Sequence, residues 1–201
     1  MTFSALRYFV LSIGLMSASA FAAEEVRDLS TGAVFPPTVT FEDNGKTYNL
    51  QATGVSTRKK FFVKVYSIAS YLQEGAHKNG GDIIREILQD DNAKQLTLKW
   101  VRNAPVDKVK EGYVESFREV LGSDYPKMQG QVDQFIQLFN NEIKKDDEHV
   151  LRWMPGGLIE VFINGHQVGS FTNKDFAKAL WSIWFGQKSV VNRDALVSLA
   201  R

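Results

Sequence analysis

The chain has 201 residues, with 24 lysines and arginines against 23 aspartates and glutamates, and it contains no cysteine. At about 150 residues per domain, this length favours a single domain. The missing cysteine excludes disulfide scaffolds, thiol catalysis, iron–sulfur clusters and zinc ribbons. A formal net charge of +1 gives none of the basic surface that nucleic-acid-binding proteins present, so nucleic acid is not an expected partner.

The first 22 residues have the order of a secretory signal peptide. Arg7 precedes an apolar run at 8–16, and small residues and the triplet Ala20-Phe21-Ala22 follow. Serines and a glycine interrupt this stretch, whereas a stable membrane span needs about 20 apolar residues. We therefore predict a signal peptide at 1–22, a single domain at 23–201, no stable membrane span, and an exported, periplasmic protein.

Turn signals and alternating hydrophobicity predict strands in the first half of the chain. Asn44-Gly45 favours a hairpin turn because both residues tolerate a positive φ. A long strand is predicted over 61–72, with Phe61, Tyr71 and the alternate residues between them facing the core and the other residues forming an amphipathic face. Asp82 is suited to cap a short helix. Expected up to residue 101 are strands at 39–41, 48–50, 61–72 and 95–101 and a helix at 83–88.

Apolar residues spaced three and four apart predict two helices in the middle of the chain. The first begins at Pro105 and ends at Gly122, and the second carries a stripe over 128–143. Turns at Pro155-Gly156-Gly157 and Asn164-Gly165 then separate short strands. Expected there are strands at 150–153, 158–163 and 167–171 and helices at 175–185 and 193–199. Clustered rather than alternating helices predict an α+β fold with a mostly antiparallel sheet.

Few motifs in the sequence indicate a catalytic or ligand-binding site by themselves. Phosphate-binding glycine loops, the nucleophile elbow and the zinc-protease motif are absent from the sequence. His77, His149 and His166 lie near expected loop or strand ends, so we interpret them as surface or hairpin histidines and expect neither a metal site nor a cofactor. The basic run Arg58-Lys59-Lys60 fits two roles: it can hold an anionic head group beside apolar surface, or it can discourage pairing at a strand edge.

The order of several motifs resembles the chalcone isomerase-like family. Near the start these are Phe35-Pro36, Ala52-Thr53-Gly54-Val55 and Arg58-Lys59-Lys60-Phe61-Phe62; near the end they include Pro155-Gly156-Gly157 and Ala179-Leu180-Trp181-Ser182-Ile183-Trp184. The resemblance covers about residues 33–200. It implies an open-faced β-sandwich, a large antiparallel sheet with helices packed on one face. The family contains plant enzymes that cyclise chalcones to flavanones, non-catalytic relatives and a branch that binds fatty acids.

The resemblance also implies roles for single residues. Arg58 is similar in position to the arginine with which the plant isomerases neutralise a phenolate. Tyr66 falls where those enzymes have a threonine, and a tyrosine there looks like the fatty-acid-binding branch, in which it and the arginine hold a carboxylate. Lys64 is a further ligand-binding candidate. The isomerases' tyrosine and asparagine fall near Pro105 and Gly112, which carry neither chemistry.

Arg58 and Tyr66 can meet on one carboxylate only if the chain changes direction between them. Eight residues of regular strand would separate the two by about 26 Å. We therefore expect a bend or bulge within Arg58-Lys59-Lys60.

Three functions remain open on the sequence alone. The first is an exported protein that binds a small lipophilic or aromatic carboxylate or phenolate, such as a fatty acid, without catalysis. The second is an isomerase, an intramolecular lyase that closes a ring by attack of a phenolate on an enone, with Arg58 as the catalytic residue that stabilises the charge. The third is an envelope accessory protein acting through protein contacts, for which the sequence names no partner.

Overall fold

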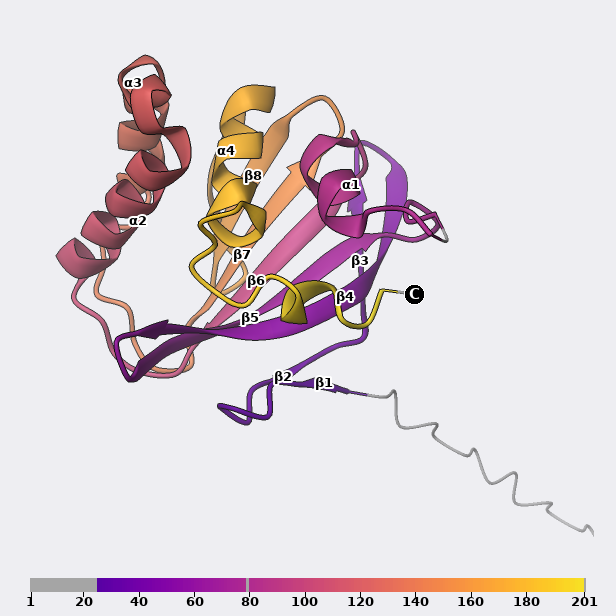
Figure 1. The fold of residues 1–201 in the computed structure, drawn as a ribbon, viewed down its shortest axis with the longest axis horizontal. Coiled ribbons are helices and arrows are strands. Elements are labelled where there is room, and N and C mark those ends of the chain that lie inside the picture. Colours follow the sequence, from indigo (N-terminus) through magenta and orange to yellow (C-terminus); the bar gives the residue numbers. More distant parts are fainter. Residues whose placement is uncertain (1–24, 79, 201) are drawn as a thin grey trace, which may run out of the picture.

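A computed structural model describes residues 25–78 and 80–200, so the predicted signal peptide at 1–22 lies outside the described residues. Its main feature is a seven-stranded antiparallel sheet in which each strand pairs with the next along the chain (Figure 1). The strands are β3 (Thr38–Asp43), β4 (Lys46–Lys60), β5 (Val63–Gln73), β6 (Lys94–Trp100), β7 (Glu148–Met154), β8 (Leu158–Ile163) and β9 (His166–Thr172). A separate pair, β1 (Val26–Arg27) and β2 (Val34–Phe35), precedes them.

The helices cover one face of this sheet, which confirms the predicted α+β class (Figure 1). They are α1 (Ile83–Gln89), α2 (Val106–Leu121), α3 (Tyr125–Ile136) and α4 (Lys174–Phe185), with single 3₁₀ turns η1 (Gly122–Asp124) and η2 (Ala195–Val197). The main core lies between sheet and helices, and a smaller cluster that includes Phe35, Tyr48 and Tyr71 lies on the opposite face. Within the described part of the chain, no helix is long and apolar enough to cross a membrane.

The predicted strand over 61–72 is wrong at its start. Phe61 and Phe62 form the turn of the β4–β5 hairpin and are 88% and 99% exposed, whereas Phe61 was expected in the core. Phe61 takes a φ of 56°, a conformation that hairpin turns ordinarily give to glycine, asparagine or aspartate. Because none of these residues marks the turn, the alternating pattern runs through it unbroken.

Strand β5 is buried on both faces, contrary to the prediction of one core face and one amphipathic face. Tyr66 and Ile68 pack under the helices, while Ala69 and Tyr71 join the cluster on the opposite side. The N-terminal segment that carries β1 and β2 covers that second face. Asp28 in this segment accepts hydrogen bonds from two hydroxyls of β4 and β5. The second face of β5 is therefore buried by a segment that is distant in the sequence, which the alternating pattern of β5 alone does not predict.

Three smaller expectations are also wrong. Helix α3 ends at Ile136, and the apolar stripe continues past it because Phe139 and Ile143 are buried outside the helix, where Ile143 bridges to Ala104. The helix expected at 193–199 is only the single turn η2. His149, expected at the surface or in a hairpin, is completely buried because its ring packs against Trp100 and Phe139.

The segment after α4 is held against β4 by an irregularity in that strand. The pairing with β5 shifts at Thr53, whose hydroxyl donates to the Leu196 carbonyl at 2.7 Å. A Cβ on Gly54 would lie only 2.2 Å from the Ala195 carbonyl oxygen, so this close approach requires glycine. The contact fixes where the chain passes on its way from α4 to η2.

Candidate functional site

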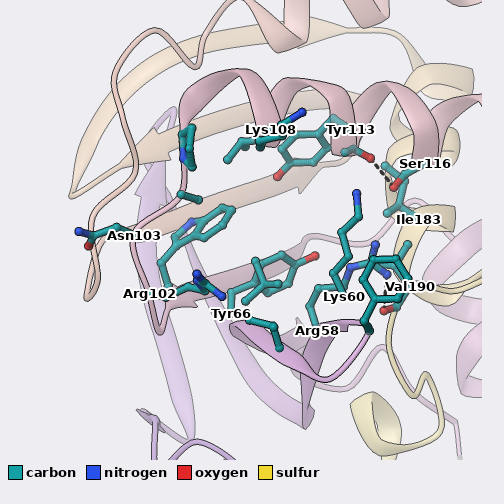
Figure 2. Close-up of a pocket in the computed structure, with 18 of the residues that line it drawn as sticks. Arg58, Lys60, Tyr66, Arg102, Asn103, Lys108, Tyr113, Ser116, Ile183 and Val190 are labelled. Carbon is teal, nitrogen blue, oxygen red and sulfur yellow. Dashed lines mark hydrogen bonds between the residues drawn. The ribbon is translucent and has the colours of Figure 1, made fainter.

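A cavity of about 380 Å³ lies between the β4–β5 hairpin, the end of β6, helix α2 and the segment after α4 (Figure 2). Its walls are largely apolar and aromatic, which is typical of sites for small organic ligands. The apolar lining includes Val63, Val65, Trp100, Val109, Ile183 and Trp184.

The cavity lining is positively charged. Four cationic residues, Arg58, Lys60, Arg102 and Lys108, line it, and no aspartate or glutamate is among its lining residues in the described part of the chain. Figure 2 shows Arg58 and Lys60 together on the side next to Val190, with Arg102 and Asn103 on the other side. An apolar cavity with several cations suits an anion with a lipophilic body.

Arg58 and Tyr66 are directly paired across the β4–β5 hairpin, and both line the cavity. Residues opposite each other in an antiparallel pair point to the same face of the sheet. An irregularity does lie between Arg58 and Lys59, but it only shifts the register by one residue, and the change of chain direction that brings Arg58 and Tyr66 together is the turn at Phe61-Phe62. The bulge therefore lies where we expect it, whereas the turn is not predicted, because the alternating pattern indicates one continuous strand from residue 61.

A β-bulge next to this pair turns Lys64 away from the cavity. Arg58 pairs with Tyr66, but the next residue, Lys59, pairs with Lys64, which leaves Val65 without a partner. Such an extra residue reverses the side on which the following residues point. As a result Val65 lines the cavity, whereas Lys64 does not, and its ammonium donates to the carbonyl of Ser30 in the N-terminal segment.

The Arg58 guanidinium is anchored but retains free donors. One of its terminal nitrogens donates to the Val190 carbonyl at 2.8 Å, so the segment after α4 orients the group. A guanidinium has five N–H donors, and within residues 25–78 and 80–200 Arg58 pairs with no carboxylate. The arrangement leaves donors available for an anion in the cavity.

Tyr66 is a buried phenol that can donate a hydrogen bond. It is 8% exposed, and its hydroxyl oxygen accepts from the indole nitrogen of Trp184 at 3.0 Å. Burial raises the pKa of Tyr66 to about 12, although the positive charge of Arg58 acts in the opposite direction. Tyr66 is therefore neutral at physiological pH, and its own proton remains available to a ligand.

Helix α2 contributes lining residues that the sequence alone did not predict. Pro105 and Gly112 do lie at the cavity, as the resemblance implied, but so do Tyr113 and Lys108. Burial raises the pKa of Tyr113 well above its ordinary value, and the nearby Tyr66 adds to this. The spacing of four between Lys108, Gly112 and Ser116 could have revealed this helix face from the sequence.

The comparisons with known proteins agree on the fold. The model of a family described as chalcone isomerase-like matches residues 29–194. No curated protein matches the chain. Among solved structures, a fatty-acid binding protein of Arabidopsis thaliana has a similar fold, with a TM-score of 0.70 and 20% sequence identity over 88% of this chain and 99% of that one.

Proposed function

The chain belongs to the chalcone isomerase-like family, and from this premise we propose that it binds a small lipophilic anion, such as a fatty acid, in the cavity without catalysing a reaction. The pairing of Arg58 with Tyr66 carries this proposal. A carboxylate between them accepts hydrogen bonds from a charged guanidinium and a neutral phenol, and charge-assisted bonds of this kind are among the strongest in proteins.

The remaining charges of the cavity support an anionic ligand. Lys60 lies 3.5 Å from Glu115 and Lys108 lies 2.7 Å from Glu111, so each of these lysines has an exposed carboxylate partner outside the lining. Arg58 and Arg102 have no such partner among the described residues. The uncompensated positive charge therefore belongs to the two arginines.

The name of the similar Arabidopsis thaliana protein also supports the proposal. That protein is a fatty-acid binding protein, and Arg58 and Tyr66 are the residues that the family resemblance associates with the fatty-acid-binding branch. At 20% identity the similarity establishes the fold alone, so the ligand has to be tested on this chain.

The direct test is native mass spectrometry of protein purified from cells, followed by lipid extraction, together with titration of a fluorescent fatty acid. We expect co-purified acid, or saturable binding of the probe that an unlabelled fatty acid displaces. Protein that is recovered free of ligand and does not bind the probe would contradict the proposal.

We also propose that the protein is exported to the periplasm after cleavage before Ala23. The basis is the sequence pattern of residues 1–22. Fractionation of the producing cells and the intact mass of the protein test this. A full-length mass in the cytoplasmic fraction would contradict export and would leave the ligand proposal untouched.

One observation favours isomerase activity as a second candidate. Tyr113 and Asn103 both line the cavity, so a tyrosine and an asparagine are present there although Pro105 and Gly112 replace them in the sequence motif. Arg58 would then stabilise the phenolate. An absorbance assay with a chalcone decides this candidate. Turnover by the wild type that Arg58→Ala abolishes supports it, whereas equal rates for both proteins remove Arg58 from catalysis.

A further inference from the structure

The closed end of the β4–β5 hairpin exposes two adjacent aromatic side chains. Phe61 and Phe62 are 88% and 99% exposed, and Val63 beside them is 44% exposed. In Figure 1 this end of the hairpin projects at the left of the molecule, below α2. Contiguous exposed apolar side chains commonly mark a surface that contacts a partner or a membrane.

The turn conformation itself argues that a phenylalanine is needed at the tip. Phe61 holds a φ of 56°, which is strained for a bulky side chain and easily adopted by glycine or asparagine. Since Phe61 is almost fully exposed, core packing does not account for its presence. Strained residues of this kind cluster at functional sites.

Lysines surround the two phenylalanines. Lys59 and Lys64 face each other across the hairpin, an arrangement of like charges that weakens strand pairing. Among the described residues neither lysine forms an ion pair with a carboxylate, and Lys60 has one exposed partner, Glu115. Exposed aromatic side chains surrounded by lysines are suited to bind the surface of an anionic bilayer, where the rings insert between headgroups and the lysines contact phosphates.

The same tip forms the mouth of the cavity, because Lys60, Phe61 and Val63 also line it. We propose that the hairpin tip, Lys59–Lys64, docks on the surface of an anionic lipid membrane. The docked tip places the cavity mouth against the lipid, so that a lipophilic ligand moves between bilayer and cavity without crossing water. This last step rests on the proposed function, whereas docking does not.

Sedimentation with vesicles tests docking directly. The wild type is expected to bind vesicles of phosphatidylcholine and phosphatidylglycerol more tightly than vesicles of phosphatidylcholine alone, and high salt should weaken this binding. Phe62→Ser should reduce vesicle affinity at least about tenfold, since burying a phenylalanine contributes that much or more. Lys59→Gln should reduce it about fivefold on anionic vesicles only.

Matched variants separate docking from folding. Phe61→Asn/Phe62→Ser should abolish vesicle binding while the melting temperature stays the same or rises, because asparagine tolerates the positive φ. Leu199→Ser removes an exposed apolar side chain elsewhere, and Lys145→Gln/Lys178→Gln removes two exposed lysines from other elements. Both controls should bind vesicles like the wild type.

Three results would overturn the proposal. The first is wild-type protein that ignores both kinds of vesicle, and the second is Phe62→Ser that binds them unchanged. The third is a dimer, detected by light scattering without lipid and abolished by Phe62→Ser, since a second copy would then cover the tip. Fluorescent fatty acid binding by Phe62→Ser in vesicle-free solution should match the wild type, because Phe62 does not line the cavity. If the wild type docks but binds no fatty acid, docking stands and the ligand proposal fails.

Discussion

Gly112 offers a substitution that should strengthen the fold and block the site at the same time. It lies in the interior of α2 and lines the cavity, and no heavy atom lies within 4 Å of a Cβ added there. The Cβ atom of a leucine at this position therefore meets no neighbouring atom, and the rest of the side chain extends into the space that the ligand is proposed to fill.

The two effects of Gly112→Leu can be estimated separately. Leucine is favoured over glycine in a helix interior by about 1 kcal/mol, which corresponds to a melting temperature higher by about 2–4 °C in a domain of this size. The affinity for a fatty acid should fall at least about tenfold because the side chain and the ligand compete for one cavity. Thermal denaturation and displacement of a fluorescent fatty acid measure the two effects.

Two controls make the result specific. Gly112→Ala should gain similar stability while leaving most of the binding intact. Gly130→Leu makes the same change in α3, at a position that is equally open and does not line the cavity, so binding should not change. If Gly112→Leu is folded and binds fatty acid like the wild type, the ligand does not occupy this cavity.

Three further substitutions test buried contacts within the fold. Tyr66→Phe should cost about 1–3 kcal/mol of stability because the buried indole N–H of Trp184 loses its acceptor. The raised pKa of Tyr66 predicts that stability falls between pH 10 and about 12, and Tyr66→Phe should remove this contribution while leaving those of Tyr71 and Tyr113, whose pKa values burial also raises. Burial lowers the pKa of His149 from 6.5 to about 4, so stability should fall as the pH drops through this range, by up to about 3 kcal/mol. Chemical denaturation at several pH values should show that His149→Phe flattens this slope. Gly54→Ala should lower the melting temperature, because its Cβ would collide with the Ala195 carbonyl; an unchanged melting temperature would show that the η2 segment is not tightly held there.

The sequence predicted those turns whose residues carry a local signal. Asn44 and Asn164 adopt φ values of 48° and 49°, and each is followed by a glycine with positive φ, as the two hairpin predictions require. The turn at Phe61-Phe62 has the same role without such a residue, so the alternating pattern predicts a strand through it. The predicted α+β class is nevertheless correct, because it depends on the order of helices and strands and not on the position of this turn.

The candidate site was only partly predictable for a related reason. Arg58 and Tyr66 came from the family resemblance, and the unexpected turn is what places them side by side. Lys64 shares strand parity with Tyr66, but a bulge of one residue reverses its direction, and alternation cannot reveal a bulge. Arg102 and Lys108 reach the cavity from the loop after β6 and from α2. The sequence does not predict that they line one cavity, because this depends on how the helix packs against the sheet.

The central claim is that Arg58 holds the anionic head group of a lipophilic ligand. The most direct measurement compares the affinities of a fatty acid and of the fatty alcohol of the same length for wild type, Arg58→Ala and Arg58→Lys. Loss of a charge-assisted contact of about 1.5–3 kcal/mol predicts that Arg58→Ala binds the acid about tenfold to over a hundredfold more weakly and the alcohol unchanged. Arg58→Lys should recover only part of the acid affinity because an ammonium lacks the planar fork. Equal losses for acid and alcohol in Arg58→Ala would show that Arg58 shapes the cavity or the fold, and would contradict the claim.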